Sequence, residues 1–509
     1  MKNTNIIKFT FSLLAATTLF AACNDDREFI SVDSSVSTGG PSTNNNNSDS
    51  DAGINDISTL SEIEKPSNTT TLPDFIYGAD FSWLTEQELT SGFKLKDKNG
   101  VAGDGVEILK GLGFNVARLR VWVNPENIVA NPNAFCNKVD VVKKAVRAQK
   151  AGMSVMIDFH FSDYWADPSQ QKKPKNWDNL TQEQLKDSAA AHVTDVLSLL
   201  KEYNVQVAMV QLGNESSTGI MLTQSDGSEA TANGSGDNYV AIHNACVDAA
   251  KTVYPNVKII THFAQGENNN RSFARAQSFI SKGMKFDIFG VSIYPYIYDD
   301  NGAITDNWYE NHVNQLFTNM KAFIVATNKQ VMIAEVGINY QDKAESWIAL
   351  NDIYVRAKNT AGCVGVCYWE PQCLNFSGYV KGVFDPSTNQ PYAEFLPIFT
   401  STTVQYSGSE EVTYPTVVKI GGVFNSWAKK IVMTSDGAGT FTYTFTTELS
   451  GSLGFYVGDG ETWYAESNTN QNEVVNADYK NITYSAGTVT IKLNCTANPY
   501  TYSIAYMAK

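Results

Sequence analysis

Residues 154–168 read SVMIDFHFSDYWADP, and this stretch shows how most of the chain is built. Its first half, Ser154–Phe161, is a short run rich in apolar side chains, which predicts a buried β-strand. Polar and aromatic residues follow the run at once. The same change from an apolar run to polar side chains recurs along residues 76–371. The pattern therefore predicts a set of buried strands whose ends carry polar side chains.

Eight predicted strands share this pattern and alternate with amphipathic, helix-like stretches. They are Ile76–Phe81, Asn115–Trp122, Ser154–Phe161, Gln206–Leu212, Lys258–Phe263, Asp287–Tyr294, Gln330–Glu335 and Gly365–Trp369. Eight strand–helix units predict an α/β fold, a closed parallel (β/α)8 TIM barrel, over residues 73–402. A doubly wound open sheet is the alternative. That fold normally carries a Gly-rich phosphate loop after its first strand, and this sequence has none there.

Residues 407–509 differ in character, because helix signals give way to alternating strands separated by Gly, Asn and Ser turns. The predicted strands are Val417–Val423, Phe441–Thr446, Leu453–Val457, Asn481–Tyr484, Thr488–Leu493 and Tyr500–Ala505. They predict a small antiparallel β-sandwich. Trp427, Trp463 and Tyr464 could form the aromatic surface of a carbohydrate-binding module. A core position for Trp427 and a spacer role for the domain are the alternatives.

The N-terminus is predicted to be a targeting segment. Lys2 and Lys8 precede an apolar run over Phe9–Ala22, which is too short to span a bilayer comfortably, and Cys23 follows it. This arrangement resembles a bacterial lipoprotein signal peptide over residues 1–22, with lipid attached to Cys23. Cleavage by an ordinary signal peptidase is the alternative.

The residues after Cys23 extend this interpretation. The acidic sequence NDD at 24–26 resembles the export signal of surface lipoproteins in Bacteroides-like bacteria. It implies a lipid anchor in the outer membrane of the cell envelope and exposure at the cell surface. Residues 23–72 are rich in Ser, Thr, Asn, Asp and Gly, a composition that predicts a flexible linker.

The overall composition limits the classes of function. The net charge of −15 argues against binding to nucleic acid. A chain with 12% aromatic and only 18% charged residues fits a secreted protein that acts on carbohydrate. The cysteines form no CxxC pair, which argues against a zinc site. We therefore expect a monomer that requires no cofactor.

In a barrel of this kind the catalytic residues lie at the carboxyl ends of the strands. The site candidates at or just after these ends are Arg118, His160, Asp163, Trp165, Asn214, Glu215, His262, Tyr294, Glu335 and Trp369. Glycoside cleavage needs one protonated carboxyl group, which donates to the leaving oxygen, and one ionised carboxylate. Glu215 and Glu335 can supply this pair. Taken singly, the candidates also suit structural roles: Arg118 a salt bridge, His262 a buried histidine and Trp165 loop packing.

The strand-end motifs, taken in order, carry a family resemblance. They are GADFS at 78–82, the run from Arg118 to Pro125, DFHFSDYWADP at 158–168, GNE at 213–215, VSIYP at 291–295, AE at 334–335 and YWEP at 368–371. Together they resemble glycoside hydrolase family 53, the endo-β-1,4-galactanases. The resemblance covers about residues 75–400.

The resemblance implies an endo-acting enzyme that cleaves internal β-1,4 bonds of galactan, or of the type I arabinogalactan of pectin, by double displacement. Glu215 would be the acid/base, Glu335 the nucleophile, and the other candidates would contact the sugar. Some bacterial members hold a structural calcium ion between their last loops. The short stretch Cys373–Phe384 departs from the family pattern, which leaves the distant sugar subsites and the calcium open. A mannanase or cellulase, and a non-catalytic glycan-binding lipoprotein, are the alternatives.

Overall fold

The computed structural model describes residues 54–507, except 129–130, 132, 300–302, 306, 341–342, 403–416, 428–430, 437–438, 458–461, 469, 471, 477–478 and 496–499. The predicted signal peptide (1–22), the lipidation site at Cys23 and the predicted linker as far as residue 53 lie outside the described residues. Within the described part of the chain, no helix has the length and apolar character needed to cross a membrane.

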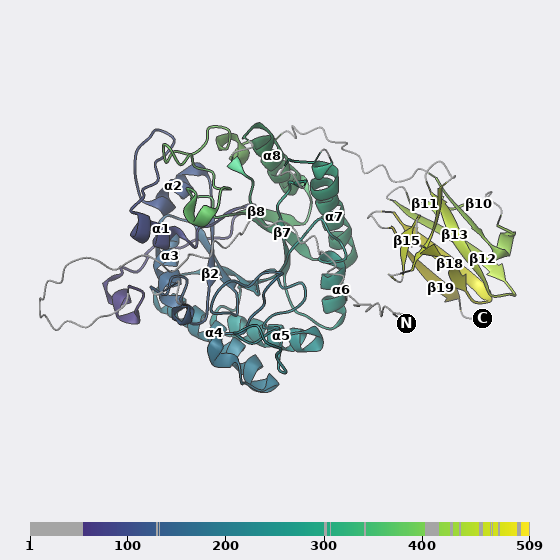
Figure 1. The fold of residues 1–509 in the computed structure, drawn as a ribbon, viewed down its shortest axis with the longest axis horizontal. Helices are drawn as coiled ribbons and strands as arrows, with labels where there is room; N and C mark the ends of the chain where they lie inside the picture. The colour runs from purple at the N-terminus through teal and green to yellow at the C-terminus, as the bar shows by residue number, and fades with distance from the viewer. Residues whose placement is uncertain are drawn as a thin grey trace, which may run out of the picture. The chain divides into compact units, whose positions relative to one another are not determined.

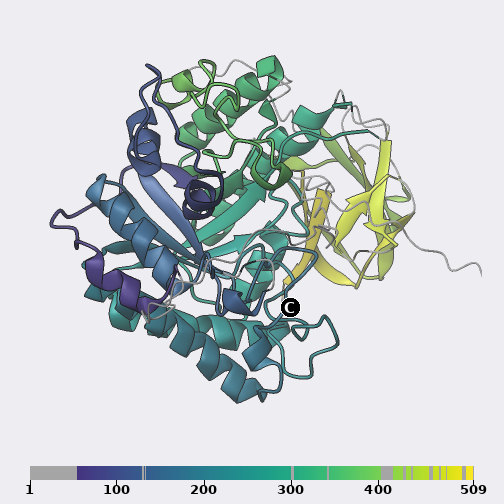
Figure 2. The same cartoon turned by 60° about the vertical axis from the view of Figure 1, so that its left-hand side comes forward.

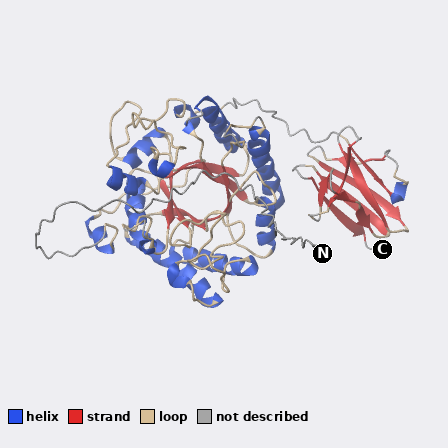
Figure 3. Cartoon of the chain, in the orientation of Figure 1, coloured by secondary structure: helices blue, strands red, loops and turns tan. Residues whose placement is uncertain are grey.

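Eight parallel strands close into a barrel in chain order, with β8 paired back to β1. They are β1 (Ile76–Asp80), β2 (Val116–Val121), β3 (Ser154–Phe159), β4 (Val207–Leu212), β5 (Lys258–Phe263), β6 (Ile288–Ile293), β7 (Gln330–Val336) and β8 (Cys363–Trp369). Every boundary lies within two residues of its prediction. Figures 1 and 3 look along the barrel and show the ring of strands enclosed by helices. The predicted (β/α)8 barrel is confirmed, and the open sheet is excluded.

The helices form the outer layer of the barrel, as the turned view in Figure 2 also shows. They are α1 (Leu84–Ser91), α2 (Gly105–Leu112), α3 (Lys138–Lys150), α4 (Gln182–Glu202), α5 (Gly236–Val253), α6 (Phe273–Ser281), α7 (Gln315–Thr327) and α8 (Lys343–Asn359). Two of them, α1 and α2, share the connection between β1 and β2. After β8 the described chain forms a 3-10 turn, Leu396–Phe399, in place of a final α-helix.

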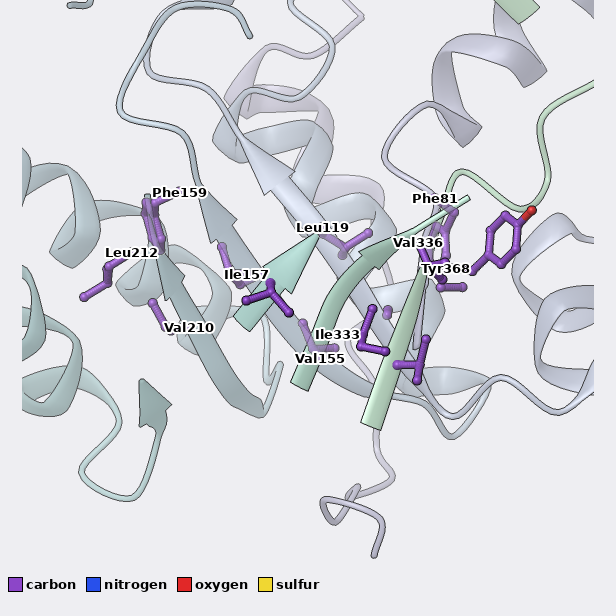
Figure 4. Packing of buried hydrophobic residues seen from close by; sticks show 14 of the residues in the cluster. Phe81, Leu119, Val155, Ile157, Phe159, Val210, Leu212, Ile333, Val336 and Tyr368 are labelled. Carbon is purple, nitrogen blue, oxygen red and sulfur yellow. The ribbon is translucent and has the colours of Figure 1, made fainter. Parts of the chain in front are cut away.

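Side chains that point outward from the strands form the larger core of the barrel. Leu119, Ile157 and Val210 lie on neighbouring strands and are fully buried (Figure 4). Burying one such side chain contributes about 1.5–3 kcal/mol. Because successive side chains of a strand point to opposite faces, this outer layer forces the alternate residues into the barrel.

The interior of the barrel has an apolar lower layer and a polar upper layer. The lower layer contains Ile76, Val116, Met156, Met209, Ile260, Ile288 and Met332. Two residues further along β2 to β5, the interior positions are Arg118, Asp158, Gln211 and His262, all of them buried. The period of two residues therefore gathers polar side chains at the carboxyl ends of the strands.

Residues 54–71 pack against the barrel, which corrects the predicted flexible linker over this part. A 3-10 helix, Ile57–Glu62, places Leu60 fully buried in the outer core. Asn68 and Gln149 each donate a side-chain hydrogen bond to the backbone oxygen of the other. The average composition of the segment suggested disorder, but its polar side chains have specific partners on the barrel.

The described residues from 418 to 507 form an antiparallel β domain. Its strands are β9 (Val418–Gly422), β10 (Ile431–Val432), β11 (Thr434–Ser435), β12 (Thr440–Thr447), β13 (Gly451–Val457), β14 (Thr462–Ser467), β15 (Glu473–Val475), β16 (Tyr479–Lys480), β17 (Ile482–Tyr484), β18 (Gly487–Asn494) and β19 (Tyr500–Met507). Ile420 and Phe455, on β9 and β13, share one core with Val489 and Ile491 on β18. Strand β14 pairs with β13 on one side and with β15 on the other, so it joins the two layers. The six predicted strands are confirmed.

Candidate active site

Glu335 lies near the end of β7, at a break in the strand register. Strands β6 and β7 pair Val291 with Ile333 and then Ser292 with Glu335, so β7 contains one extra residue here. A bulge of this kind re-aims the side chain that follows it. The Glu335 carboxylate is consequently buried, and Tyr294 Oη donates a hydrogen bond to its Oε1 over 2.7 Å.

Glu215 follows β4 in a left-handed backbone conformation. Its φ angle is +47°, which costs a non-glycine residue on the order of 1 kcal/mol. Hydrogen bonds hold the chain on both sides of it. The Gly213 N–H donates to the Phe159 oxygen over 3.0 Å, and the Ser216 N–H donates to the His262 oxygen over 2.9 Å. These bonds hold the turn and so fix the direction of the Glu215 side chain.

The two glutamates meet at the mouth of the barrel. One carboxylate oxygen of Glu215, one of Glu335 and a ring nitrogen of His262 lie within 4.8 Å of one another. Among the described residues they are the one group of three or more side chains that could hold a metal ion. Hydroxyl groups already donate to both carboxylates, Ser292 to Glu215 and Tyr294 to Glu335, each over 2.7 Å. This arrangement suits proton transfer better than metal binding.

Arg118 is buried beneath the pair and binds several carboxylates at once. Its Nη1 lies 2.6 Å from Asp80 Oδ2 and 3.5 Å from Glu335 Oε2. Its Nη2 lies 2.9 Å from Asp158 Oδ2 and donates to Asn214 Oδ1 over 2.9 Å. The planar fork of the guanidinium fixes these directions. The cation therefore stands beside Glu335 and aligns Asn214, the neighbour of Glu215.

The charges in this cluster reinforce one another. Burial acts to raise the pKa of Asp158, but Arg118 and His160 outweigh it and hold that pKa below its usual value. Burial acts to lower the pKa of Arg118, but Asp158, Asp80 and Glu335 outweigh it, so the pKa is raised. Asp158 is therefore ionised and Arg118 remains a cation.

A chain of hydrogen bonds leads from Gln211 to Glu215. Gln211 Nε2 donates to Asp158 Oδ1 over 2.6 Å and lies 3.1 Å from His262 Nδ1. The Nδ1 of His262 also lies 3.0 Å from Asn214 Oδ1, and its Nε2 lies 2.8 Å from Ser292 Oγ. Ser292 in turn donates to Glu215 Oε1. His262 therefore connects Gln211 and Asn214 to Ser292.

A second buried arginine, Arg120, is enclosed by aromatic rings. Its Cζ lies 4.3 Å from the ring centroid of Trp165, 5.2 Å from that of Trp83 and 5.4 Å from that of Trp122. Its Nη1 pairs with Glu370 Oε1 at 2.6 Å. Cation–π contacts of a desolvated arginine contribute about 2 kcal/mol. The enclosure therefore holds the loop that carries Trp165 against the end of β2.

Trp369, at the end of β8, continues this aromatic wall. Its ring centroid lies 5.2 Å from Trp83, 6.0 Å from Trp165 and 4.6 Å from Tyr379. Tyr379 Oη also donates to the Trp369 backbone oxygen over 3.1 Å. A sugar ring has apolar C–H faces and polar hydroxyl groups, so aromatic side chains beside a buried carboxylate pair suit its binding.

The family model of Glycosyl hydrolase family 53 matches residues 76–410, about two thirds of the chain. The chain belongs to glycosyl hydrolase family 53. The match begins at the first residue of β1 and includes all eight barrel strands, so the family 53 domain is the barrel. The protein is therefore a glycosidase, and the family predicted from the strand-end motifs is confirmed.

Three relatives place this family 53 chain among known sequences. The endo-beta-1,4-galactanase of Bacillus subtilis is 29% identical over 328 residues, which cover 58% of this chain and 70% of that protein. The probable arabinogalactan endo-beta-1,4-galactanase A of Neosartorya fischeri is 32% identical over 321 residues, 58% of this chain and 83% of that protein. An uncharacterized protein in the bgaB 5' region of Niallia circulans is 34% identical over 238 residues. That match covers 46% of this chain and only 63% of the relative.

Solved structures show the same fold. The Ignisphaera aggregans GH53 catalytic domain superposes with a TM-score of 0.53 at 25% identity, covering 67% of this chain and 99% of that one. A chain from a study of two fungal beta-1,4-galactanases superposes with a TM-score of 0.54 at 24% identity, covering 64% of this chain and 98% of the other. Both superpose over nearly their full length, which confirms the barrel.

Two predicted site residues of this family 53 glycosidase brace the site. His160 Nε2 lies 3.2 Å from Asp158 Oδ2, and its Nδ1 accepts from the Ala166 N–H over 3.1 Å. Asp163 Oδ2 accepts from Asn127 Nδ2 over 2.8 Å and from the Lys175 N–H over 2.9 Å. These bonds fix the loops after β2 and β3. Direct contact of His160 or Asp163 with sugar stays a prediction.

Two residues of the glycosidase site were missed from the sequence, Gln211 and Ser292. Both lie within strands that otherwise look uniformly apolar, and both are buried. Their position was readable from the period of two residues: Gln211 follows the interior residue Met209, and Ser292 shares its strand face with Tyr294. A polar residue on the inner face of a barrel strand, two positions from a catalytic motif, is the signal that identifies them.

Proposed function

We propose that this glycosidase hydrolyses internal β-1,4-galactosidic bonds in galactan and type I arabinogalactan by a retaining double displacement. The relatives from Bacillus subtilis and Neosartorya fischeri carry galactanase names, which supports galactan as the substrate. The separation of the two carboxylates supports the retaining mechanism.

The distance between Glu215 and Glu335 is the observation that carries the stereochemistry. Retaining glycosidases place their carboxyl groups about 5–5.5 Å apart, whereas inverting enzymes need about 6.5–9.5 Å to admit a water molecule. One oxygen of Glu215 and one oxygen of Glu335 lie within 4.8 Å of each other. That gap favours direct attack by one carboxylate on the anomeric carbon.

The surroundings of the two carboxylates support different roles for them. Glu335 has the Arg118 guanidinium at 3.5 Å and accepts the hydroxyl hydrogen of Tyr294. Both neighbours stabilise an anion, so Glu335 is the nucleophile. Glu215 accepts a hydrogen bond from the Ser292 hydroxyl, a neutral group that stabilises an anion less than the Arg118 cation does. This difference supports Glu215 as the group that holds a proton and acts as the acid/base.

The reaction then follows in two balanced steps. An oxygen of Glu335 attacks the anomeric carbon while the bond to the leaving oxygen breaks, and the proton of Glu215 passes to that oxygen. Water next attacks the anomeric carbon of the glycosyl-enzyme, its proton passes to Glu215, and Glu335 leaves as a carboxylate. Both inversions occur at one carbon, so the product keeps the β configuration.

Three predicted residues would bind the sugar around this carbon. Trp369 offers a ring to a C–H face of the sugar, and Tyr294 lies beside the nucleophile. Asn214 Nδ2 donates one hydrogen to the Ala166 oxygen over 2.8 Å, and the amide has a second hydrogen for a sugar hydroxyl. A lipid at Cys23 would hold the enzyme at the cell surface. Replacing Cys23 with Ala should then release the protein from the detergent phase.

Assays on defined polysaccharides test the proposal. The purified enzyme should release reducing ends from unbranched β-1,4-galactan and should leave β-1,3-linked arabinogalactan nearly untouched. Equal rates on β-mannan or carboxymethylcellulose would assign it to another polysaccharide of the same enzyme class. No activity on any of the four would favour a non-catalytic glycan-binding protein.

A further inference from the structure

Three aromatic side chains of the β domain form a cluster that the barrel's chemistry does not use. Trp463 lies at its centre, with Tyr456 at a ring-centroid distance of 4.7 Å and Trp427 at 5.8 Å. The rings are inclined to Trp463 by 63° and 57°. We call Tyr456, Trp463 and Trp427 the aromatic cradle.

The cradle lies on the outer face of the sheet. Tyr456 is paired with Lys419 on β9 and with Trp463 on β14, so the three side chains share one face. The adjacent residues, Phe455 before Tyr456 and Tyr464 after Trp463, are also paired with each other, and both pack on the domain core. This alternation corrects the predicted aromatic surface, because Tyr464 faces the core and Tyr456 takes its place.

The backbone is shaped to hold the two tryptophans. A Cβ atom on Gly454 would stand 2.2 Å from Cζ2 of Trp463, so only glycine lets the indole lie against strand β13. Ser426 and Trp427 have φ angles of +52° and +61°, a left-handed pair of non-glycine residues. The Trp427 N–H donates to the Gly422 oxygen over 2.8 Å and holds this turn.

This strained turn presents a large apolar side chain to water. Trp427 is 38% exposed, which also excludes the core position that the sequence left open. Left-handed conformations cost non-glycine residues roughly 1–3 kcal/mol and gather at ligand-binding sites. Binding of a ligand to the exposed Trp427 ring would account for the left-handed turn.

We propose that the aromatic cradle is a binding site for galactosyl residues of the polysaccharide on which the barrel acts. The family 53 match ends at residue 410, before this domain, so the family itself assigns no role to it. The identity of the sugar rests on the proposed function. The axial 4-hydroxyl of galactose leaves one ring face with clustered C–H groups, and such a face packs on an inclined indole pair. The Lys419 ammonium, on the same face, can donate to sugar hydroxyls.

The size of the cradle favours a sugar over a protein partner. Each side chain has at most about 250 Å² of surface, and none of the three is more than 38% exposed, so the cradle offers at most roughly 300 Å². A stable protein interface needs about 800 Å² from each partner. One or two sugar rings fit the smaller area. Weak binding by the cradle is sufficient, because the barrel would bind the same polysaccharide molecule and the two contacts would act together.

Affinity electrophoresis of the full-length protein tests the cradle without turnover. The Glu335→Gln variant is run in native gels that contain unbranched β-1,4-galactan, and its retardation is compared with that of Glu335→Gln/Trp427→Ala and Glu335→Gln/Trp463→Ala. The barrel contributes equally to all three, so the difference isolates the cradle. We expect retention to weaken at least about fivefold in both double variants. Glu335→Gln/Tyr479→Ala, which removes another exposed tyrosine of the domain, should stay within about twofold.

The results separate the cradle from the catalytic proposal. Trp427 is at the surface, so its replacement tests the cradle even where Trp463→Ala disturbs the sheet. Unchanged retention of the Trp427 variant would overturn the proposal. Equal loss of retention on β-mannan and carboxymethylcellulose gels would overturn galactose as the ligand. Hydrolysis by the enzyme with Glu335 intact is measured independently. If the enzyme with Glu335 intact does not hydrolyse galactan, but Trp427→Ala still weakens retention in the galactan gel, only the catalytic proposal is refuted.

Discussion

The hydroxyl group of Ser292 lies 2.7 Å from Glu215 Oε1 and donates a hydrogen bond to it. Ser292 is on β6 and Glu215 follows β4, so the bond bridges β5, which lies between them. His262 on β5 completes the bridge, with Nε2 2.8 Å from the same hydroxyl. Side chains from three successive strands therefore fix the direction of the Glu215 carboxyl group, the proposed acid/base.

Replacing Ser292 with Ala should slow turnover and move its pH profile. A hydroxyl that donates to a carboxylate stabilises the ionised form, so its loss should extend the alkaline limb of kcat/KM to higher pH. We expect kcat to fall about tenfold because the direction of the Glu215 carboxyl is no longer fixed. Steady-state rates on galactan between pH 4 and pH 9 measure both effects.

Ser292→Thr is the matched control because it keeps the hydroxyl group. It should restore most of the rate and the original alkaline limb. A Ser292→Ala enzyme with an unshifted profile and a lower rate would show that Ser292 contributes only to packing.

Replacing Arg118 should separate its charge from its geometry. Arg118→Ala removes the nearest cation from the buried Asp80 and Asp158, which should destabilise the protein by about 3–5 kcal/mol. Arg118→Lys retains the charge but loses the fork that reaches Asn214 and Glu335 together. We expect Arg118→Lys to be folded and to lose about 100-fold in kcat. Urea unfolding and galactan hydrolysis test the two effects; a fully active lysine variant would contradict the role of the fork.

The barrel was predictable because its signal is local and repeated. Each strand boundary could be read within two residues from a short apolar run and the polar residues that end it, as at Ser154–Phe159. The order of the polar ends also predicted which two glutamates meet at the barrel mouth, Glu215 and Glu335. The bulge that aims Glu335 inward was not predictable, because it depends on the register between β6 and β7. That register is a property of two strands together.

The direction of individual side chains in the β domain could not be predicted from the sequence either. Trp463 and Tyr464 are adjacent in the sequence and similar in chemistry, yet one faces out and the other faces the core. The direction depends on where β14 enters the sheet, and β14 itself was not predicted. The buried segment around Leu60 was missed for a related reason, because its partners lie on the barrel, far along the chain.

His243 should make the barrel sensitive to acid. Burial lowers its pKa to about 4, from an ordinary value near 6.5, and its Nε2 lies 3.0 Å from the Lys285 oxygen. Between pH 6.5 and pH 4 the unfolded chain binds a proton that the folded protein does not. The free energy of unfolding therefore decreases as the pH is lowered through this window, by roughly 2 kcal/mol at pH 5. His243→Gln should have a lower Tm at pH 7.5 but a smaller fall in Tm between pH 7.5 and pH 5. Equal falls in both proteins would assign the acid sensitivity to other groups.

The two catalytic glutamates should respond differently to replacement by Ala. Glu335→Ala removes the nucleophile and should nearly abolish turnover on every substrate. Glu215→Ala removes the proton donor and should slow galactan cleavage by about 10²–10⁴-fold. It should spare the first step on activated aryl galactosides, whose leaving group needs no proton. The second step then limits the rate, because no base activates water, and added azide should restore the rate by forming a β-galactosyl azide.

Proton NMR of the first product from the unaltered enzyme should show the β anomer. An α anomer, or azide rescue of Glu335→Ala in place of Glu215→Ala, would reverse the mechanism or the roles of the two residues.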